Sequence, residues 1–176
     1  MPFVAACSQQ SGTPTLTWYI NPDNGGQKRL AEKCAPANGP YKVVIQTLPN
    51  SASDQREQLV RRLAAQDSSI DVMSLDPPYV AEFANAGFLK QFDKQDEAAL
   101  TQGVLAGPLK TAYWGGKLVA APFWGNTQLL WYRKAAMAAA GVDPLSPTFT
   151  WDQMTKAAVS QNKVVAVQAN RYEGYM

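Results

Sequence analysis

A cluster of uncharged hydrogen-bonding groups interrupts the apolar stretch APFWGNTQLLWYRKAAM, which covers residues 121–137. Trp124 and Asn126 lie near its middle, within the sequence WGNTQ. An amide both donates and accepts hydrogen bonds, and an aromatic ring offers a flat apolar face. This combination suits noncovalent recognition of a ligand that presents hydroxyl groups along a rim and C–H groups on a face.

The composition narrows the chemistry further. Histidine is absent from the 176 residues, which removes the usual general base near neutral pH and the commonest zinc ligand. A Ser-His-Asp or Cys-His nucleophile system is therefore excluded within this chain. The 14 acidic residues form no EF-hand-like spacing, and we expect no metal and no cofactor. The net charge of +2 comes without a basic block, so we expect no nucleic acid partner.

Strand and helix patterns alternate along the first half of the chain. Runs of β-branched, aromatic and apolar residues predict strands at 15–20, 41–48 and 69–75. Helical patterns predict helices at 27–35, at 54–66 and from 77 to a C-terminal cap at Gly87. This alternation predicts an α/β fold with a parallel sheet flanked by helices. We expect Ser53 or Asp54 to cap the second helix, and the third strand to be buried on both faces.

The second half of the chain has weaker patterns. Residues 92–108 are loosely helical, and a Gly-Gly turn followed by a strand precedes Trp124. Further strands are predicted at 127–133 and 163–168, with a helix at 134–140 between them. Thr150 and Gln153 match a capping box, which predicts a helix starting at Trp151.

Polar residues follow the ends of the predicted strands. Asn21 and Asp23 come after the first strand, and Asp76 comes directly after the third. Ligands of open parallel sheets bind beyond the carboxyl ends of the strands. These loops are therefore the first place to expect a ligand.

Several motifs occur together in one order: YWGGKLVAAP at 113–122, NTQLLWYR at 126–133, GVDP at 141–144 and TWD at 150–152. This set resembles the extracellular sugar-binding proteins of bacterial ABC importers, family 1 of the solute-binding proteins. Within the family, DQREQLVRRLAAQDSSIDVMSLD, AEFANAG and AVQANRYEG are most similar to the trehalose-binding lipoproteins of mycobacteria. The loop NPDNGG and Trp124 depart from that pattern, so the resemblance leaves the sugar open.

The resemblance implies a periplasmic-binding-protein-like fold of type II that closes on its ligand like a hinged clamp and does no chemistry. We expect a lipobox remnant and tether at 1–14, an N-terminal sugar-binding lobe at 15–132, and a crossover with an incomplete second lobe at 133–176. Members of the family are about twice this length or more, so we expect a truncated reading frame. The implied partners are a disaccharide, trehalose or a related α-linked sugar, and the permease of an ABC importer, with the receptor itself a monomer.

The resemblance also implies which residues contact the sugar. Asp76 and Asn126 match sugar-binding positions, although Asp76 could serve only as a helix cap and Asn126 only as a turn residue. The remaining candidates are stacking aromatics, loop residues and a cleft-facing segment of the second lobe: Tyr79, Trp124, Asn21, Asp23, Tyr172 and Glu173. The other four tryptophans, at 18, 114, 131 and 151, are expected to be packing residues rather than surfaces on which a ligand stacks.

The two cysteines carry separate expectations. Cys7 ends the sequence FVAAC, which resembles a lipobox, and the polar run SQQSGTPT after it suits a flexible tether. Lipidation of Cys7 would anchor the protein to the outer face of the cell membrane. Cys34 lies in a helical pattern, where it is either a small buried apolar residue or half of a disulfide whose partner lies outside this chain.

Two other functions compete with sugar transport. One is a sensor, or a remnant that binds nothing. The other is a glycosidase in which Asp76 and Glu173 form a carboxylate pair, which would require the two carboxyl groups to lie ~5–9.5 Å apart.

Overall fold

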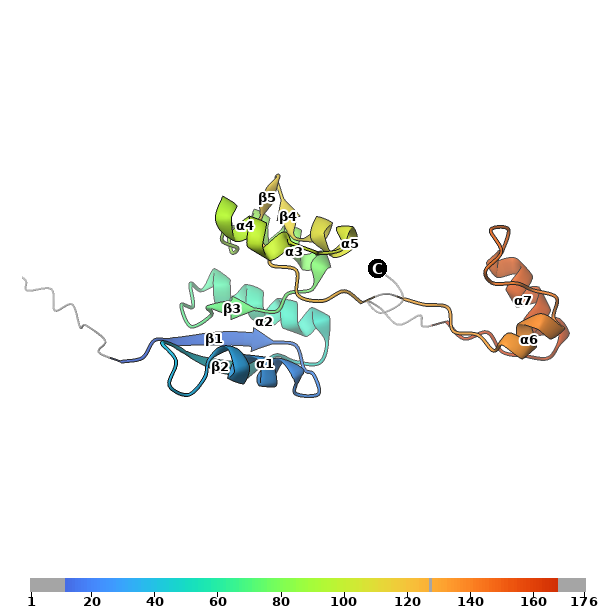
Figure 1. Ribbon diagram of the computed structural model, residues 1–176, viewed down its shortest axis with the longest axis horizontal. Helices are drawn as coiled ribbons and strands as arrows, with labels where there is room; N and C mark the ends of the chain where they lie inside the picture. The colour runs from blue at the N-terminus through green and yellow to red at the C-terminus, as the bar shows by residue number, and fades with distance from the viewer. Residues whose placement is uncertain (1–11, 127, 168–176) are drawn as a thin grey trace, which may run out of the picture. The chain divides into compact units, whose positions relative to one another are not determined.

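The computed structural model of the chain describes residues 12–126 and 128–167 (Figure 1). The chain divides into two compact units, the first ending at Trp124 and the second beginning at Gly125. In the described residues, no helix is both long enough and apolar enough to cross a membrane.

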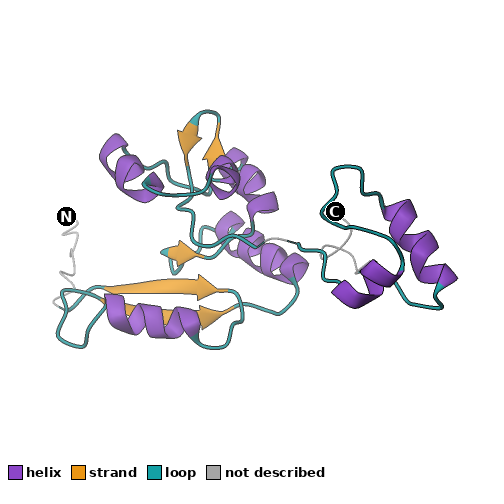
Figure 2. Ribbon diagram, turned by 45° about the vertical axis from the view of Figure 1, so that its right-hand side comes forward, coloured by secondary structure: helices purple, strands orange, loops and turns teal. Residues whose placement is uncertain are grey.

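A parallel sheet of three strands forms the centre of the first unit. Strand β1 (Thr15–Ile20) pairs with β2 (Lys42–Thr47) on one side and with β3 (Val72–Met73) on the other, giving the order β2-β1-β3. Helix α1 (Gly26–Cys34) connects β1 to β2, and α2 (Ala52–Ala64) connects β2 to β3. The α/β prediction is therefore confirmed for this part of the chain, and Figure 2 shows α1 running alongside the strands.

The register of the strands assigns residues to the two faces of the sheet. Trp18, Ile45 and Val72 are partners across the three strands and share one face, whereas Tyr19 and Met73 share the other. Side chains of α1 and β2 line a shallow hollow on the first face, so α1 covers the β2 side of that face. The opposite face packs against α2 and the segment that follows it.

The core lies on that opposite face. Tyr19, Leu48, Leu59 and Phe83 form one buried cluster, with Phe83 from the next helix, α3 (Pro77–Asn85). Leu59 and Phe83 are completely buried, and burial of a side chain of this size stabilises a fold by about 1.5–3 kcal/mol. The core thus holds α3 against the sheet. It also holds Asp76, which directly precedes α3.

Helix α3 ends as predicted. Gly87 has a φ of 76°, and the amides of Gly87 and Phe88 bond back to the carbonyls of Ala84 and Phe83. This is a Schellman motif, in which a left-handed residue after the helix is most easily a glycine. The rings of Phe83 and Phe88 pack edge to face with centroids 6.0 Å apart, which is the apolar contact that accompanies the motif.

A helical segment and a hairpin complete the first unit. Helices α4 (Lys94–Thr101) and α5 (Ala106–Thr111) fall in the region expected to be loosely helical. Strands β4 (Tyr113–Trp114) and β5 (Lys117–Leu118) pair antiparallel around a two-glycine turn with φ values of 55° and 76°. Positive φ at both positions is the geometry that a two-residue hairpin prefers.

The second unit contains helices α6 (Lys134–Ala139) and α7 (Trp151–Ser160). Both were predicted. The capping box at the start of α7 is confirmed, because the Thr150 side chain accepts from the Gln153 amide and the Gln153 side chain accepts from the Thr150 amide.

Several sequence expectations were wrong. Residues 128–133 and 163–167 form no strand, because the described residues of the second unit supply two helices and no strand with which they could pair. Strand β3 is shorter than predicted, and Val72 is 48% exposed, since β1 is its one partner among the described strands. Ser51, rather than Ser53 or Asp54, caps α2.

Candidate ligand-binding site

The loops after β1 and β3 hold the candidate site in the first unit. Residues 21–25 connect β1 to α1, and residues 74–76 connect β3 to α3. Because β1 and β3 pair in parallel, both loops leave the sheet at its carboxyl edge. The structure therefore brings together the two predicted ligand loops, which are about 50 residues apart in sequence.

Asp76 occupies the N-cap position of α3, but its side chain makes no capping hydrogen bond. Its backbone is extended. Pro78 at the second helical position has no amide hydrogen, and the Tyr79 amide at the third position bonds to the Asp76 backbone carbonyl at 3.0 Å. The carboxylate is half-buried and is not committed to the first turn of the helix. A carboxylate has several acceptor positions, so Asp76 can accept hydrogen bonds from the hydroxyl groups of a ligand.

Asp23, in contrast, is committed to local structure. Its two carboxylate oxygens accept from the backbone amides of Gln27 at 2.7 Å and Gly25 at 2.8 Å, and so hold the start of α1. The hydrogen bond from the Gln27 amide, more than any other contact, lowers the pKa of Asp23 below its usual value. The side chain is exposed, and its remaining acceptor positions face solvent.

Trp124 presents an exposed aromatic surface at the end of the first unit. It is 51% exposed, and its ring lies beside that of Phe123 with centroids 4.7 Å apart. Phe123 in turn packs edge to face against Trp18 of β1 at 5.8 Å. Trp18 is therefore a packing residue, as expected, and the two contacts tie Trp124 to the sheet.

Tyr79 is engaged with neighbouring side chains. It packs against the core cluster, and the Arg56 guanidinium carbon lies 5.9 Å from the centre of its ring. Arg56 is held there by a bidentate ion pair with Glu82, whose Oε2 accepts from Nε at 2.6 Å. Hydrogen bonding from Arg56 lowers the pKa of Glu82. Of the two aromatic candidates, Trp124 has the more accessible ring.

Asn21 joins a buried polar network that the sequence analysis did not identify. Its backbone carbonyl accepts from Gln27 Nε2 at 2.9 Å, while its own side-chain oxygen is buried without a hydrogen-bond partner. Gln27 is 1% exposed, and its Oε1 accepts from the Ser74 hydroxyl at 2.9 Å. The Ser74 oxygen accepts in turn from Trp18 Nε1 at 3.2 Å. The available signals were a glutamine at a buried helical position and a serine in an apolar run.

The remaining candidates belong to neither of these two loops of the first unit. Asn126 is exposed in the second unit, where it lies outside any helix or strand. Cys7, Tyr172 and Glu173 lie outside the described residues. Cys34 is an exposed free thiol, so the expectation of a buried apolar cysteine was wrong.

Two of the expected packing residues are also corrected. Trp131 is 87% exposed, and Trp151 is 58% exposed within the same unit. Neither is buried by the described residues of the second unit, because its two short helices cover little surface.

Two surface hollows lie elsewhere in the first unit. One, of about 450 Å³, is lined by polar and charged residues of α2, and the other, of about 290 Å³, lies between α1 and β2. Neither is lined by a predicted contact residue. We favour the carboxyl edge of the sheet over both, because that edge is where parallel sheets bind ligands. Among the described residues, no group of three acidic or cysteine side chains could share a metal ion.

Comparison with known families assigns the class of protein. Residues 29–171 match the family of bacterial extracellular solute-binding proteins. Because the match covers most of the chain, this protein belongs to that family.

Solved structures share the fold. Maltose-bound MalE3 of T. maritima aligns with 91% of this chain at 25% identity and a TM-score of 0.63. The sugar-binding protein MalE of the phytopathogen Xanthomonas citri aligns with 83% at 24% identity and a TM-score of 0.64. A binding protein of B. animalis subsp. lactis in complex with β-1,6-galactobiose aligns with 84% at 18% identity and a TM-score of 0.54. The periplasmic-binding-protein-like fold is therefore confirmed.

The chain spans less than half the length of these proteins: 42% of the T. maritima protein, 37% of the X. citri protein and 35% of the B. animalis protein.

Proposed function

We propose that this chain is part of the sugar receptor of a bacterial ABC importer, and that it captures a disaccharide without chemically changing it. The family match and the structural similarity to a maltose-bound protein support this class of function. The observation that supports named residues for this function is the Asp76 carboxylate, which lies at the carboxyl edge of the sheet and makes no capping hydrogen bond.

The proposed contacts divide between rim and face of the sugar. Asp76 accepts hydrogen bonds from a pair of hydroxyl groups, and Asn126 and Asn21 contribute amide groups. The exposed ring of Trp124 stacks on the C–H face, with Tyr79 as the second aromatic contact. Asp23, in the same loop as Asn21, is a further contact. Tyr172 and Glu173 are the contacts proposed for the second lobe. Each neutral hydrogen bond contributes only about 0.5–1.5 kcal/mol, so several must act together.

We further propose that the sugar is trehalose or a related α-linked disaccharide. The motivation is the similarity of the segment ending at Asp76 to trehalose-binding members of the family. The segment 15–132 would form one lobe and 133–176 would begin the other, with closure around the sugar creating the surface that the permease recognises. In this arrangement the receptor works as a monomer.

Calorimetric titration of the full chain with trehalose, maltose, sucrose and cellobiose tests the proposal. We expect heat of binding with the α-linked sugars and less or none with cellobiose, which is β-linked. Absence of heat with every sugar would contradict sugar binding, and a preference for cellobiose would contradict the choice of linkage. Incubation with an aryl glycoside should release no aglycone; release would instead favour the glycosidase alternative.

The membrane anchor is a separate proposal. Lipidation of Cys7 would place the receptor on the outer face of the membrane and leave residues 8–14 as a tether. Mass spectrometry of the protein extracted from bacterial membranes should find a diacylglycerol-modified cysteine, and a Cys7→Ala variant should appear in the aqueous fraction. Equal membrane retention of the variant would exclude this anchor.

A further inference from the structure

The carboxyl edges of β1 and β2 are built in a similar way around two buried glutamines. Gln27 of α1 donates to the Asn21 carbonyl at 2.9 Å, and Gln55 of α2 donates to the Pro49 carbonyl at 2.7 Å. In both cases the acceptor lies six residues earlier, in the loop that follows the strand. The two side chains are 1% and 7% exposed. Each glutamine therefore fixes the loop that enters its own helix.

The two glutamines differ in what else they hold. Gln27 also accepts from the Ser74 hydroxyl, which belongs to the loop after β3 and lies 47 residues further along the chain. Ser74 accepts from Trp18 Nε1, so a single chain of hydrogen bonds runs from α1 through the loop after β3 to β1. Leaving any of these buried polar groups without its partner is unfavourable, which gives this network one favoured arrangement.

The network touches all three segments that carry predicted sugar contacts in the first unit. It holds the loop of Asn21 and Asp23 directly, and it holds Ser74 two residues before Asp76. Through Trp18 it also reaches Phe123, whose ring lies beside Trp124. In the described residues, the hydrogen bond of the Gln55 side chain stays within its own loop. That loop carries no predicted sugar contact.

We propose that Gln27 is a positioning residue for the sugar site, and that it acts through Ser74 and Trp18 to hold the loops of Asn21 and Asp76 and the ring of Trp124 in one geometry. This inference rests on the proposed function. Gln27 is itself too buried to touch a ligand. Its effect on binding comes from the placement of other groups, and loss of a well-placed hydrogen bond to a charged group such as Asp76 weakens binding by roughly 10- to 100-fold.

Matched substitutions test the proposal in the full chain, with trehalose and maltose as probes. Gln27→Leu and Ser74→Ala should each weaken sugar binding by at least about 10-fold. Gln55→Leu removes an equivalent buried bond elsewhere, and Ser74→Thr keeps the hydroxyl; both should stay within about threefold of the unsubstituted chain. Ser74→Ala removes only one hydroxyl oxygen, so it remains informative if Gln27→Leu does not fold.

A second measurement is independent of sugar. Amide hydrogen exchange in Ser74→Ala should accelerate together in residues 21–27 and 74–76, while Gln55→Leu should accelerate exchange in residues 49–55 alone. If Ser74 acted only on its own loop, the exchange rates of residues 21–27 would stay unchanged.

The outcomes separate this inference from the proposed function. If the unsubstituted chain binds sugar, equal losses in Gln27→Leu and Gln55→Leu, or a loss under threefold in Ser74→Ala, would overturn the positioning role. If it binds none of the four sugars of the calorimetric titration, the proposed function fails and exchange alone decides. Coupled acceleration would then support Gln27 as the residue that links the loops after β1 and β3, and uncoupled exchange would overturn it.

Discussion

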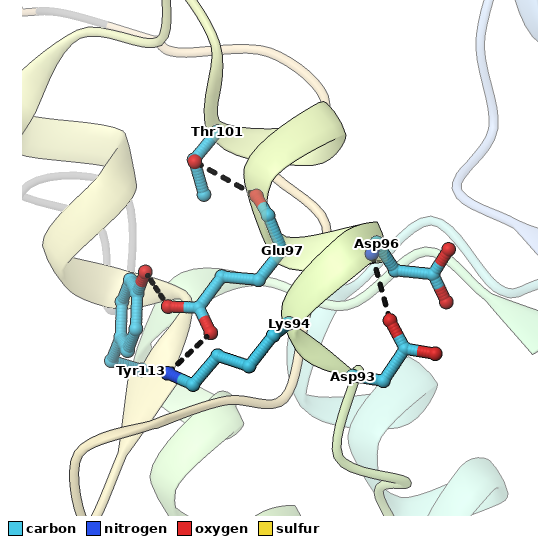
Figure 3. Close-up of polar contacts among 6 residues, drawn as sticks. All are labelled: Asp93, Lys94, Asp96, Glu97, Thr101 and Tyr113. Atoms are coloured by element: carbon cyan, nitrogen blue, oxygen red, sulfur yellow. Dashed lines mark hydrogen bonds and ion pairs between the residues drawn. The ribbon is translucent and has the colours of Figure 1, made fainter.

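Two regions of the first unit use acidic residues at helix starts in opposite ways. Asp93 precedes α4 and accepts from the Asp96 amide at 2.8 Å (Figure 3). Asp76 precedes α3 with the same extended backbone, yet its carboxylate caps nothing. Pro78 leaves the second position of α3 without an amide hydrogen, and the Tyr79 amide at the third position bonds to the Asp76 backbone carbonyl rather than to its carboxylate.

The neighbours of the two aspartates extend the contrast. Around α4, Glu97 accepts from the Tyr113 hydroxyl at 2.8 Å and from Lys94 at 3.2 Å, and the Thr101 hydroxyl donates to the Glu97 carbonyl (Figure 3). These groups satisfy one another and tie α4 to the β4–β5 hairpin. At the carboxyl edge of the sheet, the Asp76 carboxylate makes no capping bond, and the side-chain oxygen of Asn21 is buried without a partner. The first region is organised for stability, and in the second the Asp76 carboxylate remains able to accept hydrogen bonds, on which the proposed site depends.

The largest expected effect is on sugar affinity. Asp76→Ala should weaken binding by about 1.5–3 kcal/mol, because a hydrogen bond to a charged group is lost. The free energy of unfolding should change little, since the side chain makes no capping bond. Calorimetric titration and chemical denaturation measure the two quantities. An unchanged dissociation constant would remove Asp76 from the site.

Asp93→Ala should produce the opposite pattern. Loss of its capping bond should lower the free energy of unfolding by about 0.5–2 kcal/mol and leave sugar affinity unchanged. Urea denaturation followed by circular dichroism provides the measurement. If this variant lost affinity while Asp76→Ala lost stability, the contrast between the two regions would be reversed.

Trp124→Ala should have a smaller effect on affinity. If a ring against the C–H face of a sugar is comparable with an aromatic pair, the loss is ~0.5–1.5 kcal/mol. Trp114→Ala is the matched control, because Trp114 is a 42% exposed tryptophan of the same unit on the hairpin. Titration of both variants should show weaker binding in the first alone. Equal affinities would assign Trp124 to packing.

The smallest effect concerns the titration of Glu97. Its hydrogen bond from Tyr113, more than any other contact, lowers its pKa below the ordinary value of 4.5. Tyr113→Phe should therefore raise the pKa of Glu97, measured by the pH dependence of its carboxyl NMR signal. Tyr41→Phe, which loses a hydroxyl bonded to a backbone carbonyl, should leave that pKa unchanged.

The lowered pKa of Glu97 also fixes the direction of a pH effect on stability. A carboxyl group with a lower pKa in the folded state stabilises the fold above its ordinary pKa, and this contribution disappears as the pH falls through the folded value. In Tyr113→Phe, the free energy of unfolding should depend less on pH below about 4.5. The same acid dependence in both proteins would show that the Tyr113 bond does not act on Glu97.

Local signals explain which parts of the fold could be predicted. Residues within a few positions of one another specify the strands β1 and β2, the Schellman glycine after α3 and the capping box before α7. The strands predicted at 127–133 and 163–168 are absent from the described part of those ranges, residues 128–133 and 163–167. An apolar pattern indicates only a preference for strand conformation, and a strand also needs a partner.

The sequence alone determined the α/β class, the alternation of strands and helices that implies a parallel sheet, and the position of Asp76 after the third strand. It did so because the spacing of apolar residues and the positions of glycine and proline specify local conformation. Only the tertiary structure decided that Asp76 leaves its helix uncapped while Asp23 is committed, and that Gln27, Ser74 and Trp18 form one network. The members of that network are up to 56 residues apart in sequence. Their hydrogen bonds depend on the pairing of β1 with β3, which brings distant side chains within reach of one another.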